Sequence, residues 1–107
     1  MTTSRIDIFE QMLAGDPGNT MVMFGLAKEY EKAGDEAKLI ETLERYLAAA
    51  DDEGNAYGML ARAFERTKQN DKARAAYQRG VEVAGAHGHP GMAEEYRTIL
   101  ESEFSTS

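Results

Sequence analysis

Two short stretches of the sequence repeat each other and decide the fold: MFGLAKEY at Met23–Tyr30 and YGMLARAF at Tyr57–Phe64. Both carry a large residue, a leucine, an alanine and an aromatic residue at equivalent places, and the offset between them is 34 residues (57 − 23). An α-helix turns about 100° per residue, so these places form one stripe along a helix. The stripe is predicted to pack on a partner helix in both copies, with Ala27 and Ala61 allowing close approach.

Apolar residues outside these stretches keep the same 34-residue offset. The further pairs are Leu39 with Ala73, Leu43 with Tyr77, Leu47 with Val81, Phe9 with Leu43, and Leu13 with Leu47. A helix–turn–helix unit that recurs with a period of about this length is the signature of a helical solenoid. The period therefore predicts stacked helix pairs, and the remaining alternative is a helical bundle without repeats.

These residues resemble the signature of the tetratricopeptide repeat (TPR) family, in which W-x₂-L-G-x₂-Y is followed by A-x₃-F and then by P. The two stretches stand at the first half of the signature, and Ala73 with Tyr77 match the second half. Pro17 stands where a preceding half-repeat would close, whereas Leu39 replaces the small residue and Asp51 replaces the next proline. The resemblance covers residues 6–84.

The resemblance implies an all-α fold: a right-handed α-α superhelix, a TPR-like solenoid of about six antiparallel helices. One TPR-like domain is expected over residues 1–107. Its parts are a B-type helix at 4–15, a first repeat at 19–50, a second repeat at 54–84 and a capping helix at 90–104. The stretches AGDPGN, KAGDEA, DDEGN and GAHGHPG separate the predicted helices. The GAHGHPG stretch shifts the 34-residue register. The sequence therefore does not predict which face of the capping helix is buried.

Composition excludes several kinds of protein. The chain has no cysteine, which excludes thiol catalysis, disulfides and cysteine–zinc sites. The formal net charge of −7 argues against non-specific binding to nucleic acid or to an anionic membrane. The start MTTSRIDIF has no apolar run of signal-peptide length, and no later stretch is long enough to span a bilayer. A cytoplasmic protein is expected.

The predicted binding surface begins with the excess of apolar residues at Met21–Phe24. A core-facing helix needs one apolar stripe, so residues on its other side are candidates for contact with a partner. In the TPR family, which the sequence resembles, that side of the first helix of each repeat (the A helix) lines a concave groove. The candidate residues on the two A helices are Met21, Phe24, Lys28, Lys32, Asn55, Met59, Arg62 and Arg66. Gly58 is expected to leave a hollow in this groove.

The cations among these residues favour a protein or peptide with acidic side chains or a free C-terminal carboxylate. Three other interpretations stay open. The cations can be solvated or paired with Glu31 and Glu65; the first or last helix can cover Phe24 and Met21; or the same face, or the last helix, can form a homodimer. The predicted function is a non-catalytic interaction module or scaffold, with a homodimerising repeat protein as the alternative.

Signals for catalysis or metal binding are weak. His87 and His89 lie near Glu94 and Glu95, but their spacing matches no known metal site, and an ordinary exposed loop is the favoured interpretation. The sequence has no phosphate-binding glycine loop, no nucleophile elbow and no HExxH motif. No enzyme activity, cofactor or metal is predicted, and a basic strip with interleaved aromatic residues, as nucleic-acid binding requires, is also missing.

Overall fold

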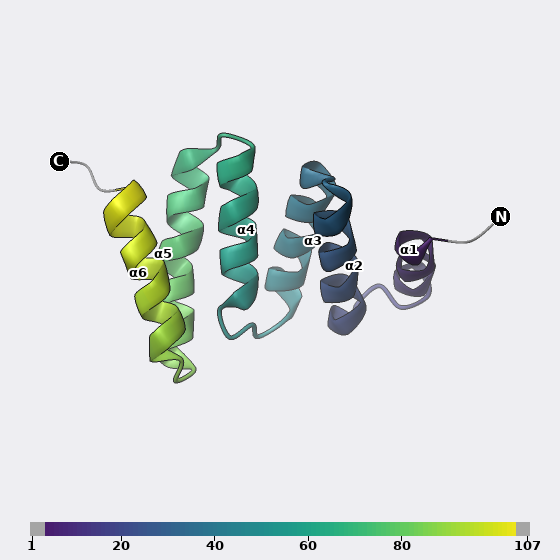
Figure 1. Ribbon diagram of the computed structural model, residues 1–107. Helices are drawn as coiled ribbons and strands as arrows, with labels where there is room; N and C mark the ends of the chain where they lie inside the picture. Colours follow the sequence, from purple (N-terminus) through teal and green to yellow (C-terminus); the bar gives the residue numbers. More distant parts are fainter. Residues whose placement is uncertain (1–3, 105–107) are drawn as a thin grey trace. The chain divides into compact units, whose positions relative to one another are not determined.

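The structure is a computed structural model that describes residues 4–104. Within this range the chain forms six α-helices and no strand (Figure 1). The helices are α1 (Arg5–Gly15), α2 (Thr20–Ala33), α3 (Glu36–Ala49), α4 (Asn55–Arg66), α5 (Asn70–Ala86) and α6 (Pro90–Glu103). The all-α prediction is confirmed. None of these described helices is both long and apolar enough to cross a membrane.

The helices group into two compact units, and each is described by itself. Unit 1 covers Met1–Asp51 and contains α1 to α3, while unit 2 covers Asp52–Ser107 and contains α4 to α6. In unit 1, α2 packs on both α1 and α3; in unit 2, α5 packs on both α4 and α6. Each unit thus has its own set of buried side chains, with one helix in contact with the other two.

Polar side chains begin the helices of unit 1 where the sequence places them. The Ser4 hydroxyl accepts a hydrogen bond from the Asp7 backbone N–H, as serine commonly does at the start of a helix. The side chains of Asn19 and Asp35 accept in the same way at the starts of α2 and α3. Gly34 ends α2 with φ 75°, a left-handed conformation that glycine adopts at little cost.

The core of unit 1 contains the stripe that the repeat predicts. All four stripe residues of α2 are buried, and Leu39 and Leu43 of α3 are fully buried beside them; the stripe residues are Met23, Leu26, Ala27 and Tyr30. Burial and the hydrogen bond that the Tyr30 hydroxyl donates to Glu10 raise the pKa of Tyr30. This bond joins α2 to α1, because Glu10 belongs to the first helix.

Gly25 occupies a different place from the one expected. The sequence places Gly25 on the same side of the helix as Met21 and Phe24. In the structure, a Cβ atom at Gly25 would lie only 3.2 Å from the ring of Phe9 in α1. Gly25 therefore faces α1, and its missing side chain leaves room for the Phe9 ring.

The core of unit 2 is built around the second copy of the stripe. Leu60, Ala61 and Phe64 are buried in α4 and Tyr77 is buried in α5, while Tyr57 is only partly buried. Burial and the hydrogen bond that the Tyr77 hydroxyl donates to Glu65 raise the pKa of Tyr77.

The start of α4 is held by an acidic residue of the DDEGN turn. The Asp52 carboxylate accepts hydrogen bonds from the backbone N–H groups of Gly54 (2.8 Å) and Ala56 (3.0 Å). Gly54 has φ 126°, which side-chain-bearing residues rarely adopt.

The end of α5 differs from expectation. This helix continues past Ala84 to Ala86 and so shortens the predicted GAHGHPG loop. Gly88, with φ 77°, then lies in the turn to α6.

Tyr96 shows which face of α6 is buried. Its exposed fraction is 4%, and its hydroxyl donates a hydrogen bond of 2.9 Å to the backbone oxygen of Gly54. A Cβ atom added at Gly58 would overlap the Tyr96 hydroxyl oxygen, and one at Gly80 would lie 2.9 Å from its ring. The missing side chains of the two glycines in α4 and α5 therefore leave the space that the Tyr96 side chain fills. Burial raises the pKa of Tyr96.

Candidate partner-binding surface

The unit 1 part of the predicted surface lies at the start of α2. Met21 has an exposed fraction of 85%, the highest among the exposed large apolar residues that the structure describes. Phe24, one turn later, is partly buried, and its ring centroid lies 5.1 Å from that of Tyr46 in α3. Thr20 joins these three residues around a shallow hollow of about 230 Å³. The site thus combines an exposed thioether with two half-covered rings.

The two lysines of α2 have different surroundings. The Lys28 ammonium lies 5.1 Å from the centroid of the Phe24 ring, a cation–π distance. The Lys32 ammonium lies 3.7 Å from the Glu29 carboxylate, which Arg5 also approaches at 3.3 Å. Lys28 therefore places positive charge over a ring that lines the hollow, whereas the charge of Lys32 is partly balanced by Glu29. The sequence offered Glu31 as a partner for such cations, but the partner of Lys32 is Glu29.

The other half of the predicted set lies on α4 in unit 2. Asn55, Arg62 and Arg66 are exposed, as a contact role requires. Met59 is buried, with an exposed fraction of 6%, which corrects the expectation that it lies on an open face. The reason is that α4 is buried around more of its circumference than one stripe, because Ala56, Gly58 and Ala63 are also covered. A helix with packing neighbours on several sides has little open apolar surface.

The hollow expected beside Gly58 is absent, because the Tyr96 side chain of α6 occupies that space. The sequence allowed the first or last helix to cover Phe24 and Met21, but it did not extend this interpretation to Gly58. Met21 is different, since its side chain is almost wholly exposed.

Sequence reasoning missed the role of Tyr46. In the sequence, Tyr46 falls at helical spacing with Leu43 and Leu47, which favours a position on the apolar stripe of the third helix. Its ring instead contacts Phe24 and lines the hollow beside Met21. Tyr46 lies three residues after Leu43, at the edge of that stripe, where an amphipathic side chain can reach the surface with its polar end. This position at the edge of the stripe could have indicated that Tyr46 reaches the surface.

The two histidines have different surroundings from those of a metal cluster in the described part of the chain. Among residues 4–104, no group of three or more potential ligands of the His, Cys, Asp and Glu types is close enough to hold a metal ion. His89 Nε2 instead contacts the Glu53 carboxylate. The hydrogen bond from His89, with the charge of the imidazole, lowers the pKa of Glu53.

The contact predicts a measurable titration. We expect His89→Ala to raise the pKa of Glu53 towards its ordinary value of 4.5, because the hydrogen bond that lowers it is lost. A folded pKa below the unfolded one adds stability above the unfolded pKa, and this contribution disappears as the pH falls through the folded pKa. NMR titration of the Glu53 side-chain carboxyl measures the shift.

His87→Ala is the matched control for this titration. His87 affects Glu53 only through its charge and more weakly than His89, so its removal should shift the pKa less. An identical Glu53 titration in the native protein and in His89→Ala would show that the His89–Glu53 contact does not form in solution.

The chain is similar along most of its length to a protein of Pseudomonas aeruginosa that is named as a TPR repeat-containing protein. The two are 30% identical over 95 residues, which span 89% of this chain and 90% of the relative. No sequence model of a protein family matches the chain. The likeness to the relative extends well beyond a single repeat, in agreement with the 34-residue period and with the six described helices.

Proposed function

Because the chain belongs to the tetratricopeptide repeat family, we propose that it is a non-catalytic interaction module that binds a peptide, helix or subunit at the start of α2. Proteins built from such repeats use extended surfaces to hold partners. The proposed contact residues are Met21, Phe24 and Lys28, with Tyr46 beside them. A contribution from Lys32 and from Asn55, Arg62 and Arg66 of α4 stays a prediction.

The observation that carries the proposal is the exposure of Met21 beside the hollow that it shares with Phe24 and Tyr46. Leaving a methionine side chain in water forgoes about 1.5–3 kcal/mol of burial, which a partner can recover. Methionine is unbranched and polarizable, and it adapts to partners of different shape. Aromatic residues with methionine are enriched where proteins meet.

The position of Lys28 indicates which chemical groups the proposed partner carries. The Lys28 ammonium lies over the ring of Phe24, and Phe24 lines the hollow, so a carboxylate of the partner can pair with Lys28 while an apolar side chain enters the hollow. The proposed partner therefore presents an apolar side chain close to an acidic group. Such a pair fixes orientation, and its contribution weakens as salt is added.

Self-association through the same residues is the competing function, since exposed apolar surface also serves subunit contacts. Light scattering at several protein concentrations separates the two. A monomer in the native protein and in Met21→Glu leaves the surface available for another protein. A native dimer that Met21→Glu converts to a monomer would replace the proposal with homodimerisation.

Binding of selected peptides tests the proposal itself. Peptides are selected from a displayed random library on the native protein, and their affinities are measured by fluorescence anisotropy. We expect Met21→Glu and Lys28→Glu each to weaken binding about tenfold or more, as loss of a central contact typically does. Met12→Glu in α1 is the matched control, because Met12 is also an exposed methionine (48%) but lies on another helix. Equal affinity for all four proteins would contradict the proposal.

A further inference from the structure

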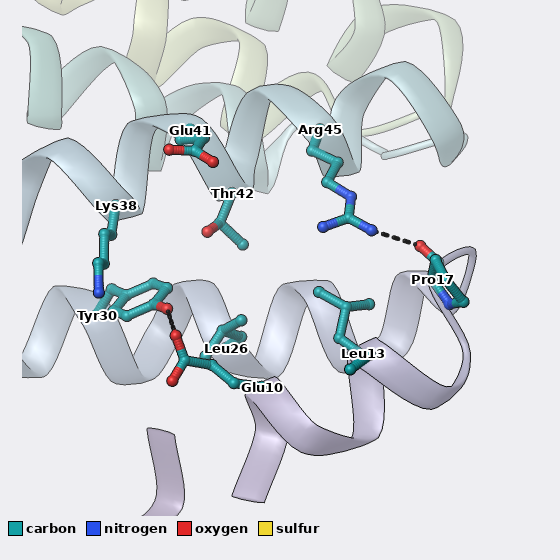
Figure 2. Close-up of a pocket in the computed structure, with 10 residues that line it drawn as sticks. Glu10, Leu13, Pro17, Leu26, Tyr30, Lys38, Glu41, Thr42 and Arg45 are labelled. Atoms are coloured by element: carbon teal, nitrogen blue, oxygen red, sulfur yellow. Dashed lines mark hydrogen bonds between the residues drawn. The ribbon is translucent and has the colours of Figure 1, made fainter. Parts of the chain in front are cut away.

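Unit 1 contains a second and larger cavity, of about 410 Å³, on residues that the proposed contact with α2 does not use (Figure 2). Its walls come from α1 and α3, and α2 contributes the residues between them. Leu13 and Leu26 give it an apolar floor. Both signs of charge line it as well, since Glu10 and Glu41 are present together with Lys38 and Arg45.

The cations of this cavity are held by neighbours that leave donors for a ligand. One terminal nitrogen of Arg45 donates a hydrogen bond of 2.9 Å to the backbone oxygen of Pro17, which fixes the guanidinium at one end (Figure 2). A guanidinium has five N–H donors, so this bond uses only a fraction of them. At the other end, the Lys38 ammonium lies 5.7 Å from the centroid of the Tyr30 ring.

Thr42 is a buried residue whose polar side chain is directed into this space. Its exposed fraction is 8%, and within residues 4–104 it is the one buried residue with a polar, non-aromatic side chain. Figure 2 shows its side chain directed from α3 into the space between α3 and α1. No hydrogen bond of the Thr42 hydroxyl is found among these described residues. Because Thr42 lines the cavity, its hydroxyl can form a hydrogen bond with a ligand atom or a water there.

The repeat shows that these polar groups are not needed to build the fold. Thirty-four residues later, the second repeat keeps the leucine, lysine and arginine of the cavity, as Leu60, Lys72 and Arg79. It has Ala76 in place of Thr42 and Ala75 in place of Glu41. Phe64, which has no hydroxyl, stands in place of Tyr30. The helices of unit 2 therefore pack without the three polar groups that line the cavity in unit 1.

We propose that the cavity binds a small zwitterion of the amino-acid class with an apolar side chain. The apolar side chain lies on Leu13 and Leu26. The ligand carboxylate pairs with Arg45 and accepts a hydrogen bond from the Thr42 hydroxyl. The ligand ammonium pairs with the carboxylates of Glu10 and Glu41. A zwitterion accounts for charges of both signs around one apolar floor, which an uncharged ligand does not.

Titration calorimetry of the full chain with L-leucine, L-methionine and L-phenylalanine tests this proposal. We expect saturable binding of at least one of them at a stoichiometry of about one. For the best ligand, the amide of the carboxyl group and the N-acetyl derivative are each expected to bind about tenfold more weakly or worse, because each removes one charge. Thr42→Val, which nearly keeps the shape of the side chain, is expected to weaken binding about fivefold.

Arg45→Gln and Arg79→Gln form a matched pair for the same measurement. The two arginines are equivalent in the repeat, but Arg79 pairs with Glu82 at 2.8 Å and does not line the cavity. Arg45→Gln should weaken binding about tenfold or more, and Arg79→Gln should leave it unchanged. Circular dichroism establishes that all variants fold. The absence of saturable binding by any of the three amino acids would overturn the proposal. The proposal would also be overturned if the blocked derivatives bound as tightly as the free amino acid, or if Arg45→Gln and Arg79→Gln lost the same amount of binding affinity.

Discussion

Tyr96→Ala is expected to destabilise unit 2 by about 3–5 kcal/mol, the range for removing a buried aromatic side chain. The ring fills the space that Gly58 of α4 and Gly80 of α5 leave open, and neither glycine has a side chain that can move into the void. The ring also lies 5.8 Å from that of Tyr77, so a neighbouring aromatic residue loses its contact. The variant therefore leaves a cavity where α4, α5 and α6 meet.

Urea unfolding followed by circular dichroism measures this loss. Tyr96→Phe is the matched variant, since it keeps the ring and removes only the hydrogen bond to the backbone oxygen of Gly54, at a cost of about 1 kcal/mol. Arg97→Ala, at an exposed neighbour, should change stability by less than about 0.5 kcal/mol. A loss below about 1 kcal/mol for Tyr96→Ala would mean that α6 does not pack on the two glycines.

Leu43→Ala is expected to destabilise unit 1 by about 2–5 kcal/mol. Leu43 has an exposed fraction of 0% in α3, the helix that packs on α2. It stands at the place that Phe9 and Tyr77 take in the other copies of the period, so a large side chain is required there in each copy. Shortening the side chain removes apolar contacts and leaves a void that rigid helices fill poorly.

The same urea experiment tests Leu43→Ala, with Glu44→Ala as its control at the next, exposed position. The control should lie within about 0.5 kcal/mol of the native protein. If the two variants were equally stable, the position of Leu43 in the core of unit 1 would be disproved.

The repeat predicted much of the fold because helical periodicity and a fixed offset are properties of the sequence itself. Ala27 and Ala61 are both fully buried, as small residues at a helix contact should be. Ser4 and Asp35 belong to the residue types that favour the start of a helix, and their side chains accept the backbone hydrogen bonds that such caps form.

Periodicity gives the direction in which a side chain leaves its helix, but it does not identify the neighbour that covers it. Gly58 was therefore expected to leave a hollow, since only the register of α6 brings Tyr96 against it. Met59 was expected on an open face for the same reason and is buried. The cavity at Thr42 was also missed, because its lining comes from three helices whose spacing depends on packing.

Partners are proposed to bind at the start of α2, and an NMR map of a bound peptide shows which residues they contact. A peptide selected on the native protein is titrated into the isotope-labelled chain, and the shift of every backbone amide is recorded. We expect the largest shifts at Thr20, Met21, Phe24 and Lys28, with further shifts at Tyr46 in α3. Shifts confined to unit 2, with the amides of α2 unchanged, would contradict this proposal.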